Sequence, residues 1–134
     1  MLQTWARVLD QIPDSRLRIL VITDSLHKEQ IRSHFVQRGI SEDRLDLIGR
    51  IPIESYFSCY LDIDIALDSF PYNGATTTCD ALVMGVPVAT VCGDRSIARG
   101  GVSLVSTLGM QDWIASSADE LVKMLGGHTK PPTR

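Results

Sequence analysis

The stretch Leu61–Gly85, LDIDIALDSFPYNGATTTCDALVMG, decides the fold that we expect for this chain. It predicts a buried strand over Ile63–Leu67, a tight Pro/Gly loop, and a helix over Thr77–Met84 that ends at Gly85. A strand that leads through a short loop into a helix is typical of α/β proteins. The loop would then lie at the C-terminal edge of the sheet, where open α/β sheets bind their ligands.

The Pro/Gly loop has the composition of an anion-binding turn. Asn73-Gly74 supplies the backbone freedom for a tight turn, and Thr76 and Thr77 then enter the helix. The first N–H groups of a helix have no intrahelical partner and lie at the positive end of its dipole, so they attract phosphate. A second interpretation needs no ligand, because Thr77 and Asp80 form a T-x-x-D pattern that is close to a capping box. The residues alone leave both interpretations open.

Helices and strands alternate along the rest of the chain. We expect helices over Met1–Gln11, from Ser25 to Gly39, after Pro52, up to Leu108 and from Ala118 to Leu125, and strands over Leu17–Ile22, Leu45–Ile48, Val86–Val91 and Gln111–Ala115. This order predicts a three-layer, Rossmann-like parallel sheet with helices on both faces. The chain opens on a helix, which indicates that the first strand of such a sheet is missing from it. We interpret residues 1–125 as one domain and residues 126–134 as a flexible tail.

The composition is that of an ordinary soluble domain. The chain has 134 residues, 44% of them hydrophobic, and a net charge of −3, which suits one domain with a real core. Its mildly acidic balance and scattered basic residues argue against a nucleic-acid or anionic-membrane partner. No apolar run approaches the roughly 20 residues of a membrane helix, and the first residues do not resemble a signal peptide. We therefore expect a cytoplasmic protein.

No residue pattern indicates a metal site. The three cysteines are odd in number and lack metal-ligand spacing, so we expect them to be reduced, buried thiols. The three histidines form neither an HxH nor an HExxH pattern. Asp62, Asp64 and Asp68 would share one face of a strand, where we expect a structural role at the strand ends rather than metal binding.

A long motif connects the chain with a known family. Residues 64–115, DIALDSFPYNGATTTCDALVMGVPVATVCGDRSIARGGVSLVSTLGMQDWIA, resemble the C-terminal catalytic half of protein O-GlcNAc transferases, including their bacterial and SPINDLY-like relatives. The segments from Trp5 to Leu17 and from Phe35 to Leu45 match the same family. The resemblance implies a GT-B architecture, in which two Rossmann-like domains hold UDP-GlcNAc between them. It also implies inverting transfer of GlcNAc to Ser or Thr hydroxyls, with no metal or other cofactor.

The resemblance implies roles for the residues of the turn. Thr76 and Thr77, which follow the turn glycine Gly74, would hold the diphosphate of the donor, and Asp80 would accept hydrogen bonds from the ribose hydroxyls. The leaving UDP gains negative charge as the glycosidic bond breaks. Donors already aimed at the diphosphate would therefore stabilise the transition state more than the ground state.

The uracil side of the site departs from the family. The resemblance places Arg50, Ile51 and the helix after Pro52, which carries Tyr56, beside the uracil ring. Relatives usually have a histidine at the position of Tyr56. A tyrosine can still stack on the base but cannot carry a positive charge near neutral pH.

The resemblance also implies parts that this sequence lacks. They are the first strand with a phosphate-binding lysine, the N-terminal catalytic half, the tetratricopeptide repeats and the long C-terminal helices. The general base and the groove for the protein acceptor would belong to those parts, so no catalytic residue is assigned here. We expect the donor-binding domain of a transferase, present as a fragment that is inactive alone. The alternative is a non-catalytic, degenerate nucleotide-binding or interaction module with the same fold.

Overall fold

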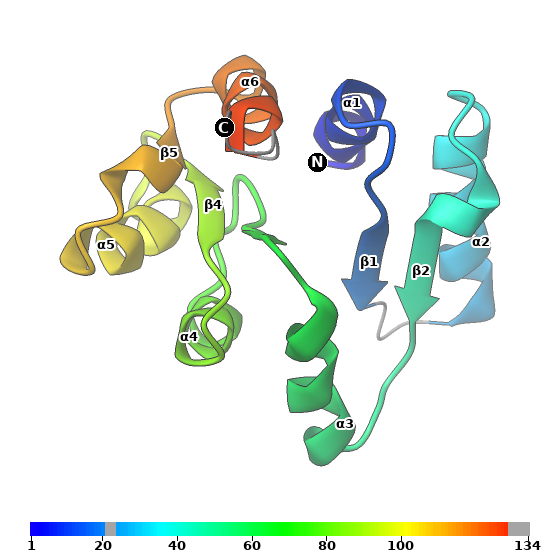
Figure 1. Cartoon of the computed structure of the whole chain (residues 1–134), viewed down its shortest axis with the longest axis horizontal. Coiled ribbons are helices and arrows are strands. Elements are labelled where there is room, and N and C mark those ends of the chain that lie inside the picture. The colour runs from blue at the N-terminus through cyan, green and yellow to red at the C-terminus, as the bar shows by residue number, and fades with distance from the viewer. Residues whose placement is uncertain (21–23, 129–134) are drawn as a thin grey trace, which may run out of the picture. The chain divides into compact units, whose positions relative to one another are not determined.

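The computed structural model describes residues 1–20 and 24–128 (Figure 1). It divides into two compact units, Met1–Pro52 and Ile53–Arg134. Every strand pair in the described residues is parallel, which confirms the α/β class predicted from the alternation of helices and strands. The single domain expected over residues 1–125 stays a prediction.

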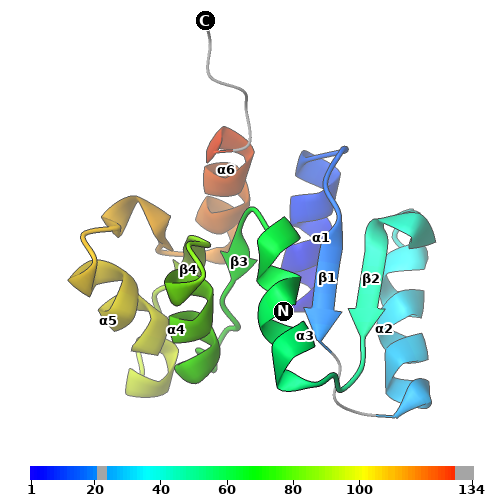
Figure 2. The same cartoon turned by 60° about the horizontal axis from the view of Figure 1, so that its bottom comes forward.

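The first unit is a two-stranded parallel sheet with two helices. Its elements are α1 (Leu2–Gln11), β1 (Leu17–Leu20), α2 (Ser25–Val36), a 3-10 turn (Glu42–Arg44) and β2 (Leu45–Ile48). Leu17 pairs with Leu45 and Leu20 with Ile48, and the two arrows point the same way in Figure 2. Ala6 and Leu9 of α1 meet Ile31 and Phe35 of α2 in one buried cluster. The helical spacing of these apolar residues is therefore what packs both helices onto the sheet.

Arg44 ties this unit together at the end of α1. Its guanidinium donates to the carbonyl oxygens of Leu9 at 2.7 Å, Ile12 at 3.0 Å and Ser15 at 2.9 Å. The last carbonyls of a helix have no intrahelical partner, and a cation is favoured at that end of the dipole. Arg44 thus satisfies the C-terminus of α1 from a point next to β2.

The second unit is a three-stranded parallel sheet in the order β3-β4-β5 with four helices. Its elements are α3 (Ile53–Ser58), a 3-10 turn (Cys59–Asp62), β3 (Ala66–Leu67), α4 (Thr76–Val83), β4 (Val88–Val91), a 3-10 turn (Ser96–Ala98), α5 (Gly100–Thr107), a 3-10 turn (Gln111–Trp113), β5 (Ile114–Ala115) and α6 (Ala118–His128). The central strand β4 is buried along its whole length. A strand covered on both faces is typical of a parallel sheet between helices.

The core of this unit lies around β4. Val88 packs with Ala81 of α4 and Val105 of α5 in one cluster. Side chains alternate along a strand, so Ala89 and Val91 face the opposite side. Helix α6, with three buried apolar residues, contacts β4 and β5.

Three predicted strands are shorter in the structure than the sequence predicts. The strand expected from Val86 begins at Val88, because Pro87 has no N–H to donate and the N–H of Val86 returns to the carbonyl of Ala81 at 2.9 Å. This bond, with Gly85 at φ 79°, closes α4 in a Schellman motif. The strand expected over Ile63–Leu67 pairs only at Ala66 and Leu67, opposite Val88 and Ala89. The strand expected over Gln111–Ala115 is confirmed only at Ile114–Ala115, because Gln111–Trp113 form a 3-10 turn in which the Trp113 N–H donates to the Met110 carbonyl at 3.0 Å.

The ends of other elements also differ from the prediction. Helix α6 continues to His128, so the first residues of the expected tail, Gly126–His128, are helical, and the remainder of that tail lies outside the described residues. The expected strand Leu17–Ile22 is confirmed up to Leu20, and its last two residues also lie outside the described ranges.

Candidate functional site

The turn between β3 and α4 is built on a buried carboxylate. Asp68 follows β3 and is only 6% exposed. Its Oδ1 accepts the Gly74 N–H at 2.8 Å, and its Oδ2 accepts the Thr90 hydroxyl at 2.9 Å. Burial raises the pKa of Asp68, although its hydrogen bonds with Gly74, Thr90 and Ser69 act in the opposite direction. The structural role expected for Asp68 is thus specific: it fixes the turn to the neighbouring strand β4.

Asn73 connects the same turn to the start of α5. Its amide nitrogen donates to the Ser69 carbonyl at 2.7 Å, and its amide oxygen accepts the Gly101 N–H at 3.2 Å. Its own backbone N–H donates to the Ile97 carbonyl at 3.0 Å. The Phe70–Pro71 peptide bond in this loop is cis. The hydrogen bonds of Asn73 thus connect the turn to Ser69 within the loop, to Gly101 of α5 and to Ile97 of the 3-10 turn before it.

Gly74 allows the chain to come close to the first turn of α4. A β-carbon at Gly74 would lie 2.4 Å from Oγ1 of Thr77 and 3.2 Å from Oγ1 of Thr78. The carbonyl of Gly74 accepts the Thr78 hydroxyl at 3.0 Å. A side chain at this position would force the Thr77 hydroxyl to move, so the absence of a β-carbon at Gly74 lets the turn approach the first turn of α4 as closely as it does.

The capping box that was one of the two interpretations of Thr77 and Asp80 does not form. The N-cap of α4 is Ala75, which makes no side-chain cap hydrogen bond, and Thr77 is the second residue of the helix. The first intrahelical bond runs from the Cys79 N–H to the Ala75 carbonyl at 3.0 Å. The N–H groups of Thr76, Thr77 and Thr78 therefore lie ahead of the helical ladder, as those of an uncapped N-terminus do. The capping-box alternative is therefore not the arrangement that these residues adopt.

The three threonines differ in what their side chains do. Thr78 is buried and its hydroxyl is used within the turn, whereas Thr76 and Thr77 are exposed. The exposed hydroxyls lie on the same first turn as the unpaired N–H groups. Cys79, one residue further, is also exposed, so the expectation of a buried thiol is wrong there, while Cys59 and Cys92 are half-buried.

Asp80 lies one helical turn after Thr76, and its carboxylate already has a partner. Oδ2 accepts the hydroxyl of Tyr56 from α3 at 2.9 Å, and the same hydroxyl is 2.9 Å from that of Tyr60. Helices α3 and α4 lie side by side in both views of the chain (Figures 1 and 2). Burial raises the pKa of Tyr56, and its hydrogen bonds with Tyr60 and Asp80 raise it further. The structure thus joins by a hydrogen bond two residues for which the family resemblance implies different roles, Tyr56 at the uracil and Asp80 at the ribose.

Arg50 and Ile51 belong to the other compact unit. They follow β2 and precede Pro52, with Arg50 exposed and Ile51 half-buried. Their role beside a base stays a prediction.

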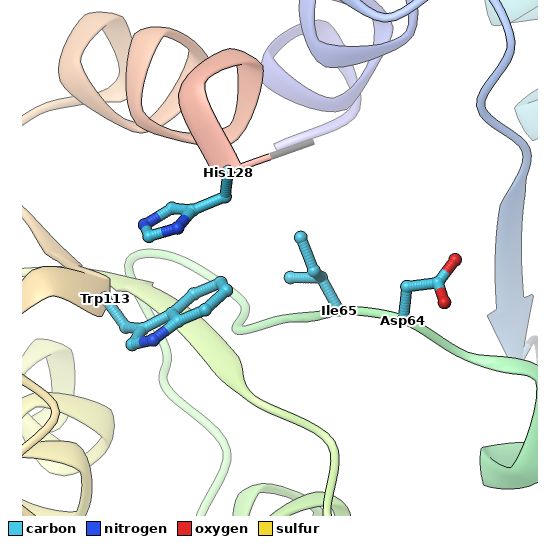
Figure 3. A pocket seen from close by; sticks show the side chains of 4 residues that line it. All are labelled: Asp64, Ile65, Trp113 and His128. Atoms are coloured by element: carbon cyan, nitrogen blue, oxygen red, sulfur yellow. The ribbon is translucent and has the colours of Figure 1, made fainter. Parts of the chain in front are cut away.

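A separate pocket of about 410 Å³ lies in the second unit. It is lined by Asp64, Ile65, Trp113 and His128 (Figure 3). The rings of Trp113 and His128 are stacked 4.1 Å apart, and the carboxylate of Asp64 points away from them. None of the residues around the turn lines this pocket, so it is not part of the candidate site.

The described residues hold neither a candidate metal centre nor a candidate membrane span. They contain no group of three or more His, Cys, Asp or Glu side chains that could hold a metal ion. Within residues 1–20 and 24–128, no helix has both the length and the apolar character that crossing a membrane requires.

The family model for glycosyl transferase family 41 matches residues 1–128. The chain belongs to this family. Among curated relatives, the probable UDP-N-acetylglucosamine–peptide N-acetylglucosaminyltransferases SPINDLY of Petunia hybrida and of Arabidopsis thaliana are each 38% identical to the family 41 chain over 129 residues. Each alignment covers 92% of this chain but only 14% of the relative.

The fold agrees with this assignment. A solved structure of a mutant O-GlcNAc transferase from Thermobaculum terrenum matches 98% of the family 41 chain with a TM-score of 0.91 and 32% identity, over 26% of its own length. The resemblance stated from the sequence is therefore confirmed, as is the Rossmann-like fold class. The sequence spans about one seventh of the length of the SPINDLY relatives that it matches.

Proposed function

We propose that this family 41 chain is the UDP-GlcNAc-binding part of an inverting transferase that modifies Ser or Thr hydroxyls of proteins. The observation that carries the proposal is the uncapped N-terminus of α4, where unpaired N–H groups and the exposed hydroxyls of Thr76 and Thr77 lie together. Such an N-terminus is an anion site, because its donors and its dipole both favour negative charge. The printed names of the SPINDLY relatives, which specify UDP-N-acetylglucosamine and a peptide, support the choice of donor and acceptor.

The spacing along α4 fits a nucleoside diphosphate. Thr76 and Asp80 are four residues apart in the helix, so they lie on one face, one turn from each other. A diphosphate at the first turn would therefore have a carboxylate one turn away that can accept ribose hydroxyls. Under this proposal Gly74 allows the close approach of the turn, and Thr76, Thr77 and Asp80 contact the donor.

The chemical contribution of this site would be to the leaving group. When the bond between the sugar and the β-phosphate breaks, negative charge grows on UDP. Donors fixed in place before the reaction stabilise that charge without reorganising, and one such donor in the oxyanion hole of a protease is worth about 3 kcal/mol. We infer that the N–H groups and hydroxyls at α4 take this role without a metal ion.

Titration calorimetry of UDP into the 134-residue chain tests the proposal. The wild type should bind UDP in the presence of EDTA, and Thr77→Ala should weaken binding about tenfold, because a hydrogen bond to a charged group is lost. Thr107→Ala is the matched control, since Thr107 is an exposed threonine at the other end of a helix, α5. The absence of binding at millimolar UDP, or equal effects of the two substitutions, would contradict the proposal.

A further inference from the structure

The hydroxyls of Tyr60 and Tyr56 and the carboxylate of Asp80 form a directed chain. Tyr56 is 2.9 Å from both partners. An ionised carboxylate only accepts hydrogen bonds, so the single proton of the Tyr56 hydroxyl is donated to Asp80. Tyr56 must then accept from Tyr60. The order of donation is therefore Tyr60 to Tyr56 to Asp80.

The two tyrosines are held in place by packing. Their rings are one helical turn apart and meet edge to face, with centroids 5.5 Å apart, and Phe57 contacts Tyr56 in a similar way at 5.2 Å. The Tyr60 ring also packs against the core cluster that contains Ala81. A hydroxyl on a ring fixed in this way offers its proton in one direction, and hydrogen bonds in such a chain strengthen one another.

The hydrogen bond from Tyr56 occupies only one of the two carboxylate oxygens of Asp80. Tyr56 uses Oδ2 of Asp80, and no other group of the described residues hydrogen-bonds this carboxylate. Asp80 is half-buried, whereas Thr76, one turn before it on the same helix face, is exposed. Oδ1 of Asp80 can therefore accept a further hydrogen bond from a ligand. Because Asp80 and Thr76 belong to the same helix, Oδ1 lies about one helical turn from the proposed phosphate site.

We propose that Tyr56 is a positioning residue that orients Asp80 to read the hydroxyls of a ribose. This inference rests on the proposed function and adds a specificity to it. By holding Oδ2, Tyr56 would prevent the carboxylate from rotating and would present Oδ1 to the sugar. The site would then select ribonucleoside diphosphates over analogues that lack the ribose hydroxyls, and Tyr56 would set the size of that preference.

Binding measurements with three ligands distinguish a role of Tyr56 in orienting Asp80 from a role in stabilising the fold. UDP carries both the diphosphate and the ribose hydroxyls, 2′,3′-dideoxy-UDP lacks only the hydroxyls, and inorganic pyrophosphate lacks the nucleoside. Dissociation constants for all three would be measured by calorimetry with the wild-type chain, Tyr56→Phe and Tyr60→Phe. Thermal unfolding of each variant shows whether it is folded.

The expected result is a selective loss. Tyr56→Phe should weaken UDP binding about tenfold, leave pyrophosphate binding within about twofold, and bring the ratio of the UDP and dideoxy-UDP affinities close to one. Tyr60→Phe should show the same pattern with a smaller effect, since it removes only the outer bond of the chain.

Other results would overturn the inference. If Tyr56→Phe binds UDP as the wild type does, or weakens UDP and pyrophosphate equally, Tyr56 does not position Asp80 for ribose, while the phosphate site still stands. If the wild type binds neither UDP nor pyrophosphate, the proposed function fails and this inference fails with it.

Discussion

Gly101 of α5 lies directly against Asp68: a β-carbon at Gly101 would be 1.9 Å from Oδ2 of Asp68 and 2.6 Å from Oγ1 of Thr90. The start of α5 is therefore packed on the carboxylate that fixes the turn before α4. Two glycines, Gly74 and Gly101, approach the same Asp68 from two elements. The conformation of the turn before α4 therefore depends on the close packing of Gly101 against Asp68.

Gly101→Ala should reduce the free energy of unfolding by about 1–3 kcal/mol, because a methyl group would be forced into a filled space. Gly100→Ala is the matched control. There the nearest atom to a β-carbon is 3.8 Å away, and alanine is favoured in a helix over glycine by up to about 1 kcal/mol. Urea unfolding of both variants measures the difference. Equal stability of the two variants would contradict the packing at Asp68.

The buried Asp68 should make stability depend on pH with a defined sign. Its pKa is raised in the folded protein, so the folded state binds a proton more tightly than the unfolded chain does. As pH falls from neutral through this raised pKa toward the ordinary value of 3.8, the wild type should gain stability relative to Asp68→Asn, which does not titrate. Paired urea unfolding curves between pH 7 and pH 4 measure this difference. A difference that stays constant, or shrinks at low pH, would show that burial does not raise this pKa.

Arg44→Lys should destabilise the first unit by about 1.5–3 kcal/mol, although it keeps the charge. A lysine ammonium cannot reproduce the planar fork that reaches the carbonyls of Leu9, Ile12 and Ser15. The chain has two tryptophans, Trp5 in one unit and Trp113 in the other, so a Trp113→Phe background lets fluorescence report on the first unit.

The control for Arg44 is Arg38→Lys at an exposed position, which should change stability by less than about 0.5 kcal/mol. If both substitutions have the same small effect, the hydrogen bonds of Arg44 do not stabilise the end of α1.

Ser117→Ala should cost about 1 kcal/mol of unfolding free energy. The Ser117 hydroxyl accepts the Glu120 N–H at 3.1 Å, as an N-cap of α6 does. Ser103→Ala, at an exposed position within α5, is the comparison and should be neutral or slightly stabilising. A cost at Ser103 that equals the cost at Ser117 would show that the N-cap is not the cause.

The start of α6 is a case in which the local sequence predicts both the position of a helix and its N-cap. The helix expected from Ala118 does begin there, and Ser117 and Glu120 have the spacing of a capping box at its start. The Glu120 carboxylate, however, accepts the N–H of Ser116 at 2.6 Å, one residue before Ser117, whose N–H a capping box would use. Hydrogen bonds within one helical turn can thus be predicted from neighbouring residues, although here the N–H that Glu120 accepts belongs to Ser116 and not to Ser117.

The same type of pattern was misleading at α4. Thr77 and Asp80 have the spacing of a capping box, but the N-cap of α4 is Ala75, so Thr77 already lies inside the helix. The Asp80 carboxylate instead accepts the hydroxyl of Tyr56, which lies 24 positions away in the sequence. The local pattern could not show this partner, because the packing of α3 against α4 brings the two side chains together.

The sequence by itself determined the elements around the turn, the position of the turn after β3, and the family. These features depend on residues that are neighbours in the chain, such as Asn73-Gly74 and the threonines that follow, or on a long shared motif. The tertiary structure alone decided which polar groups meet: Asp68 with Thr90 across 22 positions, Gly101 against Asp68, and Tyr56 with Asp80. Hydrogen bonds between distant residues are fixed by the packing of helices against a sheet, and no local propensity encodes that geometry.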